Sequence, residues 1–313
     1  MKARLARRIA ERQFFYPIRL FIMVLNSSGF GGRIFRLLAF TLVAAFLSAC
    51  STSETLNVAK IAPPDAPLTE KFAAIVIDAN TGKVLYANNA DETRFPASLT
   101  KMMTMYLMFD QLAQGKATLN SPIFFSANAA GQPPSKLGIK SGSFLIYDEA
   151  LRALAVKSAN DVAMAVAETI GGTGDSFAAM MTIKARSLGM SRTRFTNASG
   201  LPDSQMVTTA RDMAILGMAL RKNHPRYYGY FKQTSFDIDE REVRGHNKTL
   251  GVIPGADGIK TGYTRASGFN LATSVKFGGR SIVAVVMGEK TGAIRDQRMR
   301  SIISQTLPKA SVR

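Results

Sequence analysis

The chain has 313 residues, of which 46% are hydrophobic, so it is long enough for one large domain or two small ones and apolar enough to fill a core. Its formal net charge is +18, yet no Arg-rich block and no nucleic-acid-binding motif accompanies the charge, so we expect no nucleic-acid partner. An anionic membrane or wall surface explains the charge better. One cysteine and two histidines exclude an intrachain disulfide and a metal-ligand cluster. We expect no metal and no cofactor, and any chemistry must use Ser, Thr, Lys, Arg and carboxylates.

The N-terminal segment has the pattern of an export signal. Arg33 and Arg36 precede an apolar run of thirteen residues, Leu37 to Ala49. A membrane span needs ~20 apolar residues, whereas a run of this length is typical of a signal sequence. We therefore expect residues 1–49 to direct export, with translation starting at Met1 or, alternatively, at Met23.

The apolar run ends in LSAC, Leu47 to Cys50, which resembles the bacterial lipobox. In that motif the cysteine is lipidated and becomes the first residue of the mature protein. We expect Cys50 to anchor the protein to the periplasmic face of a bacterial membrane, either inner or outer. The alternative is an unmodified Cys50 after an uncleaved helix. Residues 50–68 are polar and contain Pro, as in a flexible tether.

Strands are predicted near both ends of the remaining chain. The runs 73–78 and 84–89 flank the Gly-containing turn NTGK, which predicts a β-hairpin. Gly268 to Gly288 holds a second pair of runs around GGR, again a hairpin. The helix predicted at Thr291 to Gln305 completes a domain over 69–307, followed by a tail over 308–313.

The middle of the chain is predicted to be mostly helical. One helix is expected over Ser98 to Leu112 and ends at Gly115, and a longer Ala-rich helix is expected over Tyr147 to Ile170. Strands at both ends with helices between them predict an α+β fold, in which both chain ends build one antiparallel sheet around a mostly helical insert.

Ser98 and Lys101 stand three residues apart in PASLTKMMT and share one face of the expected helix. Free backbone N–H groups at the helix start favour a developing oxyanion at Ser98. Lys101 precedes the apolar run MMTMYLMF, where desolvation lowers the pKa of an amine and makes it a general base. By itself the pair is weak evidence, because Ser98 as an N-cap and Lys101 as a solvated side chain explain it equally well.

Two further fragments strengthen the case for a site. Ser158-Ala159-Asn160 follows Ser98 by 60 residues, and Lys260-Thr261-Gly262 follows Ser158 by 102. S-x-x-K, S-x-N and K-T-G in this order resemble the signature of penicillin-binding proteins and class A β-lactamases. With FPASLTKMMT, TRFTNASGLPD and GADGIKTGYT, the resemblance extends over about Leu68 to Leu307. It is to the low-molecular-mass penicillin-binding proteins, the serine-type D-alanyl-D-alanine carboxypeptidases with the DD-peptidase/β-lactamase-like fold.

The resemblance implies a role for each motif residue. Ser98 would attack the carbonyl between the last two D-alanines of a peptidoglycan stem pentapeptide and form an acyl-enzyme, which penicillins would also form as inhibitors. Lys101 would take the proton of Ser98, helped to stay neutral by Lys260. Ser158 would relay protons between Lys101, Lys260 and the leaving amine. Asn160 would hydrogen-bond a substrate amide.

The remaining residues implied by the resemblance bind substrate. Backbone N–H groups of Ser98 and Tyr263 would form the oxyanion hole, and Lys260 and Thr261 would bind the terminal carboxylate. Gly262 would leave room for the substrate backbone. Arg295 is expected to be a further carboxylate anchor, with a solvated helix arginine as the alternative. We expect Asp257 and Asn270 to be structural, and His224 and His246 to be ordinary loop residues. Lys248 is expected near the site, without an assigned role.

Three other functions fit the same motifs. A DD-endopeptidase cuts peptidoglycan cross-links by the same chemistry. A class A β-lactamase needs a loop glutamate for rapid deacylation, and no Glu occurs between Glu168 and Glu240, although Asp203 is a conceivable substitute. A lipid-anchored wall-binding protein with a silent site is the third alternative.

Overall fold

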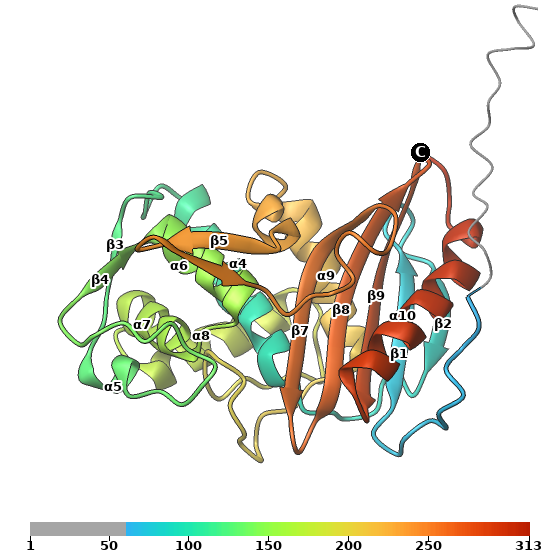
Figure 1. The fold of residues 1–313 in the computed structure, drawn as a ribbon, viewed down its shortest axis with the longest axis horizontal. Coiled ribbons are helices and arrows are strands. Elements are labelled where there is room, and N and C mark those ends of the chain that lie inside the picture. The colour runs from blue at the N-terminus through green and yellow to red at the C-terminus, as the bar shows by residue number, and fades with distance from the viewer. Residues whose placement is uncertain (1–60) are drawn as a thin grey trace, which may run out of the picture. The chain divides into compact units, whose positions relative to one another are not determined.

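The computed structural model describes residues 61–313, which belong to one compact unit. A five-stranded sheet with helices on both faces forms one side of this unit, and a mostly helical part forms the other (Figure 1). The expected export signal, Cys50 and the two alternative starts lie outside the described residues. Among residues 61–313, no helix has both the length and the hydropathy that crossing a bilayer requires.

The sheet strands are β1 (Ala73–Asp78), β2 (Val84–Asn88), β7 (Ala256–Thr264), β8 (Gly268–Phe277) and β9 (Arg280–Glu289). Two short pairs are β3 (Pro122–Phe124) with β4 (Phe144–Ile146), and β5 (Ser235–Ile238) with β6 (Arg241–Arg244). The α-helices are α4 (Lys101–Ala113), α5 (Ala127–Ala130), α6 (Tyr147–Arg152), α7 (Asn160–Gly171), α8 (Gly174–Ser187), α9 (Ala210–Asn223) and α10 (Gly292–Thr306).

The five-stranded sheet has the order β2-β1-β9-β8-β7, and every neighbouring pair is antiparallel. Its strands come from the first and last thirds of the described chain, and the helical part lies between them in sequence. The predicted α+β fold with a sheet built from both chain ends is therefore confirmed. The strand β7, which carries the K-T-G motif, lies at one edge of this sheet.

Both faces of the sheet are buried, because successive side chains of a strand point to opposite faces. In β9, Val283 and Val285 belong to the core shared with the helical part, whereas Ala284 and Val286 are buried outside that core. Helix α9 covers the face of Val283, since a Cβ at Gly217 would lie 3.0 Å from that side chain. Helix α10 covers the opposite face (Figure 1).

The prediction of one helix over 147–170 is wrong. Helix α6 ends at Arg152, a turn of π-helix follows over Ala153–Lys157, and Ser158 has the left-handed φ of 61° before α7 begins. Tertiary contacts cause the break, because the backbone N–H of Asn160 donates to Ser135 O at 2.7 Å, outside any helical pattern. Local propensity, which is high in this Ala-rich stretch, is overridden by these contacts.

The other predicted elements are confirmed with small shifts of their ends. Both hairpins form, and the final helix runs from Gly292 to Thr306 with Thr291 as its N-cap. The helix predicted from Ser98 begins as a 3₁₀ turn, Ala97–Thr100, and continues as α4. The pairs β3–β4 and β5–β6 were not predicted, since strands of three or four residues carry little periodicity.

The segments on either side of the expected domain are attached to the sheet layer. Ile61, in the expected tether, donates its backbone N–H to Ser304 Oγ of α10 at 3.2 Å. Ser311, in the expected tail, donates its backbone N–H to Asp78 Oδ2 at 2.8 Å. Both contacts bind segments that are remote in sequence to the same layer.

Candidate active site

Ser98 lies in the 3₁₀ turn that leads into α4. The segment before it is held by Asn270 of β8, whose Nδ2 donates to Phe95 O and Pro96 O, both at 3.1 Å. Asn270 is thus structural, as the sequence predicted. The turn and the first turn of α4 bring backbone N–H groups, with their partial positive charge, next to the Ser98 hydroxyl.

The Lys101 side chain is fully buried and makes three short contacts through Nζ. Ser98 Oγ lies 3.2 Å from Nζ, Asn160 Oδ1 lies 2.7 Å away and the carbonyl oxygen of Ser199 lies 2.6 Å away. The first two partners belong to the predicted motifs. Three segments that are distant in sequence therefore converge on this one amine.

Burial lowers the pKa of Lys101 well below its ordinary value, and the positive charge of Lys260 lowers it further. The carboxylate of Asp161 acts in the opposite direction, but it is a smaller influence. Two backbone N–H groups, of Leu137 and Gly138, already donate to this carboxylate at 3.1 and 2.8 Å. The net effect favours the neutral amine that a general base requires.

Ser158 is buried beside Lys101's partners, yet its Oγ has no hydrogen-bond partner among residues 61–313. The expected bridge from Ser158 to Lys101 and Lys260 is therefore not formed in this structure. The physical reason is that each amine donates to a backbone carbonyl instead. Lys101 donates to Ser199 O, and Lys260 Nζ donates to Thr261 O at 3.0 Å. The hydroxyl of Ser158 remains available for a group that enters the cleft.

Asn160, the first residue of α7, uses both ends of its amide. Its Oδ1 accepts from Lys101, and its Nδ2 donates to Pro133 O at 2.9 Å. One amide hydrogen and one oxygen lone pair remain for other partners. Asn160 therefore contacts the lysine in addition to the loop at Pro133, and its expected hydrogen bond to a substrate amide stays a prediction.

Strand β7 brings Lys260, Thr261, Gly262 and Tyr263 to the edge of the sheet facing Ser98. Gly262 is required by the close approach: a Cβ there would lie 3.0 Å from the backbone nitrogen of Ser98. Burial and the charge of Arg295 lower the pKa of Lys260 to about 7. Tyr263 is 55% exposed, and its ring stacks on that of Phe269.

Arg295 of α10 is buried, with only 6% of its surface exposed, so the alternative of a solvated helix arginine does not hold. Its Nε and Nη2 donate to Asp296 Oδ1 at 2.9 and 2.7 Å, and its Nη1 donates to Asn270 O at 3.3 Å. These contacts fix the guanidinium at one end of the cleft.

A cleft of about 610 Å³ joins these residues. The predicted residues that line it are Ser98, Ser158, Asn160, Thr261, Gly262, Tyr263 and Arg295. The amines of Lys101 and Lys260 lie behind this wall, in the buried interior. No carboxylate lines the cleft among the described residues.

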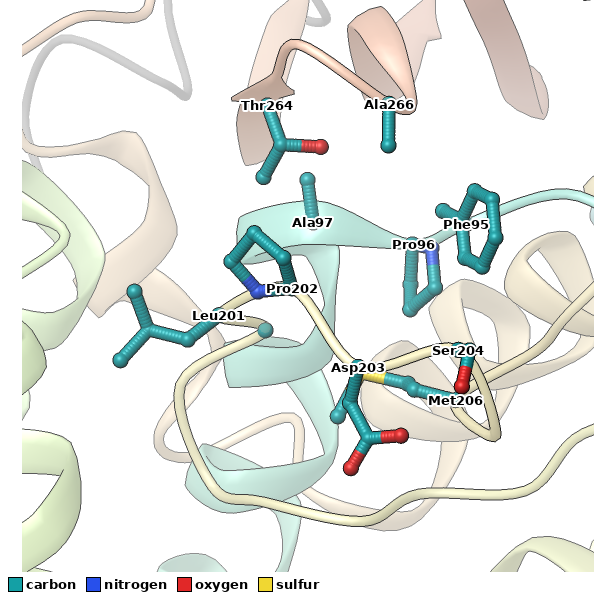
Figure 2. Close-up of a pocket in the computed structure, with 11 residues that line it drawn as sticks. Phe95, Pro96, Ala97, Leu201, Pro202, Asp203, Ser204, Met206, Thr264 and Ala266 are labelled. Carbon is teal, nitrogen blue, oxygen red and sulfur yellow. The ribbon is translucent and has the colours of Figure 1, made fainter.

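A smaller, apolar cavity of about 220 Å³ adjoins the cleft (Figure 2). Phe95, Pro96 and Ala97, which directly precede Ser98, form one wall, and Thr264 and Ala266 close it. The loop 200–206 lines its remaining side. This loop also lines the cleft through its first residues, so the two hollows share a wall.

Two residues of the site were missed or misread from the sequence. Ser199 supplies the carbonyl that holds Lys101, a backbone role that no side-chain pattern predicts. His246 was read as an ordinary loop residue, but it lines the cleft with Arg295, and burial followed by the charges of Lys260, Lys157 and Arg295 lowers its pKa. His224 lies away from the cleft and packs against Tyr106, 4.6 Å between ring centroids.

Comparisons with known proteins agree with this site. The family model described as D-alanyl-D-alanine carboxypeptidase matches residues 61–291. The D-alanyl-D-alanine carboxypeptidase DacA of Escherichia coli is 32% identical over 284 residues, which cover 88% of this chain and 70% of that protein. DacF of Bacillus subtilis is 33% identical over 238 residues, 75% of this chain and 61% of that protein.

Solved structures of penicillin-binding proteins have the same fold. Penicillin binding protein 5 from Haemophilus influenzae aligns with a TM-score of 0.71 at 29% identity, over 77% of this chain and 72% of that chain. A penicillin-binding protein from Listeria monocytogenes, solved with ampicillin bound, aligns with a TM-score of 0.69 at 26% identity, over 76% of this chain and 99% of that one. The chain therefore belongs to the D-alanyl-D-alanine carboxypeptidase family, the low-molecular-mass penicillin-binding proteins that its three motifs resemble.

Proposed function

We propose that Ser98 is the nucleophile with which this carboxypeptidase removes the terminal D-alanine from peptidoglycan stem pentapeptides. The observation that carries the proposal is the set of contacts of Lys101 Nζ. Two of its three partners, Asn160 Oδ1 at 2.7 Å and Ser199 O at 2.6 Å, can only accept hydrogen bonds. A neutral amine has two N–H donors and one lone pair, so both donors are used and the lone pair is left for the hydroxyl of Ser98 at 3.2 Å.

The proposed reaction begins with attack of Ser98 Oγ on the carbonyl carbon of the last peptide bond. The proton of the hydroxyl passes to Lys101 Nζ, and then through the hydroxyl of Ser158 to the nitrogen of the leaving D-alanine as the C–N bond breaks. A water molecule hydrolyses the resulting ester, which releases the shortened peptide and restores Ser98. Backbone N–H groups of Ser98 and Tyr263 stabilise the oxyanion in both steps.

Substrate orientation follows from the order of residues along β7. Thr261, with Lys260 behind it and Arg295 at the same end of the cleft, binds the terminal carboxylate. The scissile carbonyl lies beside Tyr263, two residues further along the strand. The acyl part then extends toward Thr264 and the loop 200–206, and its backbone pairs with the free edge of β7.

In this proposal, penicillins acylate the same serine, and the resulting acyl-enzyme is hydrolysed slowly. No carboxylate of the described residues lines the cleft to activate a deacylating water. Asp203, the conceivable substitute, lines the neighbouring apolar cavity instead, and its Oδ1 accepts from the backbone N–H of Gln205 at 2.8 Å. This geometry argues against the β-lactamase alternative. The contacts of Lys101 with Ser98 and Asn160 argue against a silent wall-binding protein.

A direct experiment measures two reactions of the full-length, exported protein. We expect covalent labelling by a fluorescent penicillin and release of D-alanine from a muramyl pentapeptide, both abolished in Ser98→Ala. Ser204→Ala, at an exposed position of the cavity next to the cleft, is the matched control and should retain both. Labelling that persists in Ser98→Ala would overturn the assignment of the nucleophile.

We further propose that the protein is exported and held at a membrane by a lipid on Cys50. The support is the sequence LSAC after an apolar run of signal length. A diacyl or triacyl group gives stable anchoring, which a single chain does not. Cys50→Ser should move the enzyme from the membrane fraction to the soluble fraction without loss of penicillin labelling. Retention of the variant in membranes would contradict the anchor.

A further inference from the structure

Three segments that are remote in sequence meet at one end of the five-stranded sheet. We call them together the basic end, and they are the β1–β2 turn 79–83, the β8–β9 connection 276–280 and the C-terminal segment 307–313. Arg313 N donates to Gly279 O at 3.0 Å, and Asn80 Nδ2 donates to Ser311 O at 3.0 Å. The end of the chain thus lies beside the turn between β8 and β9 (Figure 1). These contacts make the basic end one continuous surface.

The basic end carries positive side chains that no nearby carboxylate neutralises. Its sequence contains no Asp or Glu, and beside Arg313 it holds the cations Lys83, Lys276, Arg280 and Lys309. None of them forms a salt bridge with any of residues 61–313. Asp78, which directly precedes the first segment, is buried and accepts from the backbone N–H groups of Ser311 and Asn80, both at 2.8 Å. The positive charge at the surface is therefore free to attract an anionic partner.

One apolar side chain is exposed among these cations. Val312 forms a β-bridge with Arg280 and is 62% exposed. At the boundary of an anionic bilayer, cations meet the headgroup phosphates and an apolar side chain meets the acyl region. The composition of the basic end thus fits an anionic lipid surface.

The proposed lipid anchor joins the described chain next to the basic end. The backbone N–H of Ile61 donates to Ser304 Oγ in the last turn of α10, and that helix continues through the 3₁₀ turn Leu307–Lys309 into the basic end. Ile61 follows Cys50 by eleven residues, which span at most about 40 Å when fully extended. A lipid on Cys50 therefore keeps the basic end close to a bilayer and raises its effective concentration there.

The basic end lies far from the acyl end of the cleft. Strand β8, Gly268–Phe277, has ten residues and runs from the β7–β8 turn to the basic end, a distance of roughly 30 Å. Thr264, which marks the acyl end of the cleft in the proposed orientation, lies at the start of that turn. A protein bound through its basic end would direct the acyl end of the cleft away from the bilayer.

We propose that the basic end binds the anionic phospholipid headgroups of the membrane that holds the protein. The inference rests on the proposed lipid anchor and adds a second contact to it. The lipid attaches the chain at one point, whereas the basic end fixes how the folded domain is oriented on the membrane. The cleft then receives stem peptides from the side of the wall.

The test places the full-length, lipidated protein in phosphatidylcholine vesicles with and without phosphatidylglycerol. Val312→Cys carries an environment-sensitive fluorophore, because a lipidated Cys50 leaves the chain no other reactive thiol. Ala266→Cys, at an exposed position of the β7–β8 turn, is the matched labelling control. We expect a blue shift of the emission from position 312 that requires phosphatidylglycerol and disappears at high NaCl. The label at position 266 should not shift.

Charge variants connect this shift to the cations. In the Val312→Cys background, Lys83→Gln/Lys276→Gln/Lys309→Gln should lose the shift. The matched control Lys116→Gln/Lys140→Gln/Lys290→Gln removes three exposed lysines outside the basic end and should keep it. Without the lipid, in Cys50→Ser, the first triple variant should bind phosphatidylglycerol vesicles roughly tenfold or more weakly than its parent, since each cation near an anionic surface contributes to binding. Penicillin labelling checks that every variant is folded.

Each outcome decides the inference. A shift at position 312 that is equal in both kinds of vesicle, or an equal shift at position 266, would overturn it. Binding of the Cys50→Ser protein to purified peptidoglycan and not to phosphatidylglycerol vesicles would assign the basic end to the wall instead. If the first triple variant does not fold, the salt dependence of the shift in Val312→Cys decides. A reactive thiol at Cys50 in the wild type would reject the lipid anchor, and vesicle binding by Cys50→Ser would then test the basic end by itself.

Discussion

Asn160 Oδ1 accepts a hydrogen bond of 2.7 Å from Lys101 Nζ, and both side chains are buried. This contact joins the second motif to the first and directs one N–H of the amine away from Ser98. It also makes the charge at position 160 a strong determinant of the protonation state of Lys101, because an ionised partner in a buried pair acts through a low local dielectric.

Asn160→Asp should therefore raise the pKa of Lys101, since a carboxylate at this distance favours the protonated amine. A protonated Lys101 accepts no proton from Ser98, so acylation at pH 7 should fall at least roughly tenfold and recover in part as the pH rises. The measurement is the second-order rate constant for penicillin acylation from pH 5 to 10. Asn120→Asp, in an exposed turn, is the control. An unchanged pH profile in Asn160→Asp would contradict the proposed base.

Gly262→Ala tests the fit between β7 and the nucleophile. The added Cβ would lie 3.0 Å from Ser98 N and 3.1 Å from Leu99 N, so the strand and the turn must separate by a few tenths of an ångström. The two proposed oxyanion donors lie on these two segments, and we expect acylation to slow roughly tenfold or more with only a small change in stability. Gly229→Ala, where a Cβ meets nothing within 4 Å, is the matched control. Normal acylation by Gly262→Ala would show that the approach is not critical.

Lys260 links stability to pH. Its pKa is about 7 in the folded protein and near 10.5 when exposed, so between these values the unfolded chain binds a proton that the folded protein lacks. Stability should rise with pH in this window, by up to about 1.4 kcal/mol per pH unit from this group. In Lys260→Met that contribution disappears.

The measurement for Lys260→Met is the free energy of unfolding by urea at pH 7.0 to 9.5. Higher pH is avoided because burial raises the pKa of Tyr228 in the folded protein, so ionisation of that tyrosine in the unfolded chain lowers stability there. Lys83→Met, at a surface turn, should keep the wild-type slope. Parallel slopes for wild type and Lys260→Met would contradict a buried lysine with a pKa of about 7.

Arg298 and Glu289 form a buried ion pair between α10 and the end of β9, with 2.5 Å between Nε and Oε1. Their side chains are only 9% and 1% exposed, so removal of one partner leaves an uncompensated charge in the interior. Arg298→Met should lower the free energy of unfolding by about 3–5 kcal/mol, and the double variant Arg298→Met/Glu289→Leu should lower it less. Urea denaturation of the two variants measures both values. If the two variants lose the same free energy of unfolding, the cause is the lost packing of Arg298 and not the unpaired carboxylate of Glu289.

The sequence by itself determined the three motifs, the strands at both ends and the family. These features are local. A β-branched run next to a Gly turn, as at 73–78, favours a strand, and the Ser and Lys of S-x-x-K lie on one face of a helix because they are three residues apart. The same local signals predicted α10 to within one residue at each end.

Only the tertiary structure decided how these segments form a site. The helix predicted over 147–170 is broken at Ser158 because residues 135–138 offer its backbone and Asp161 better partners than the helix does. The carbonyl of Ser199 holds Lys101 through the backbone, and His246 reaches the cleft from a loop. Such contacts depend on distances between segments that are far apart in sequence, and no pattern within any one segment encodes them.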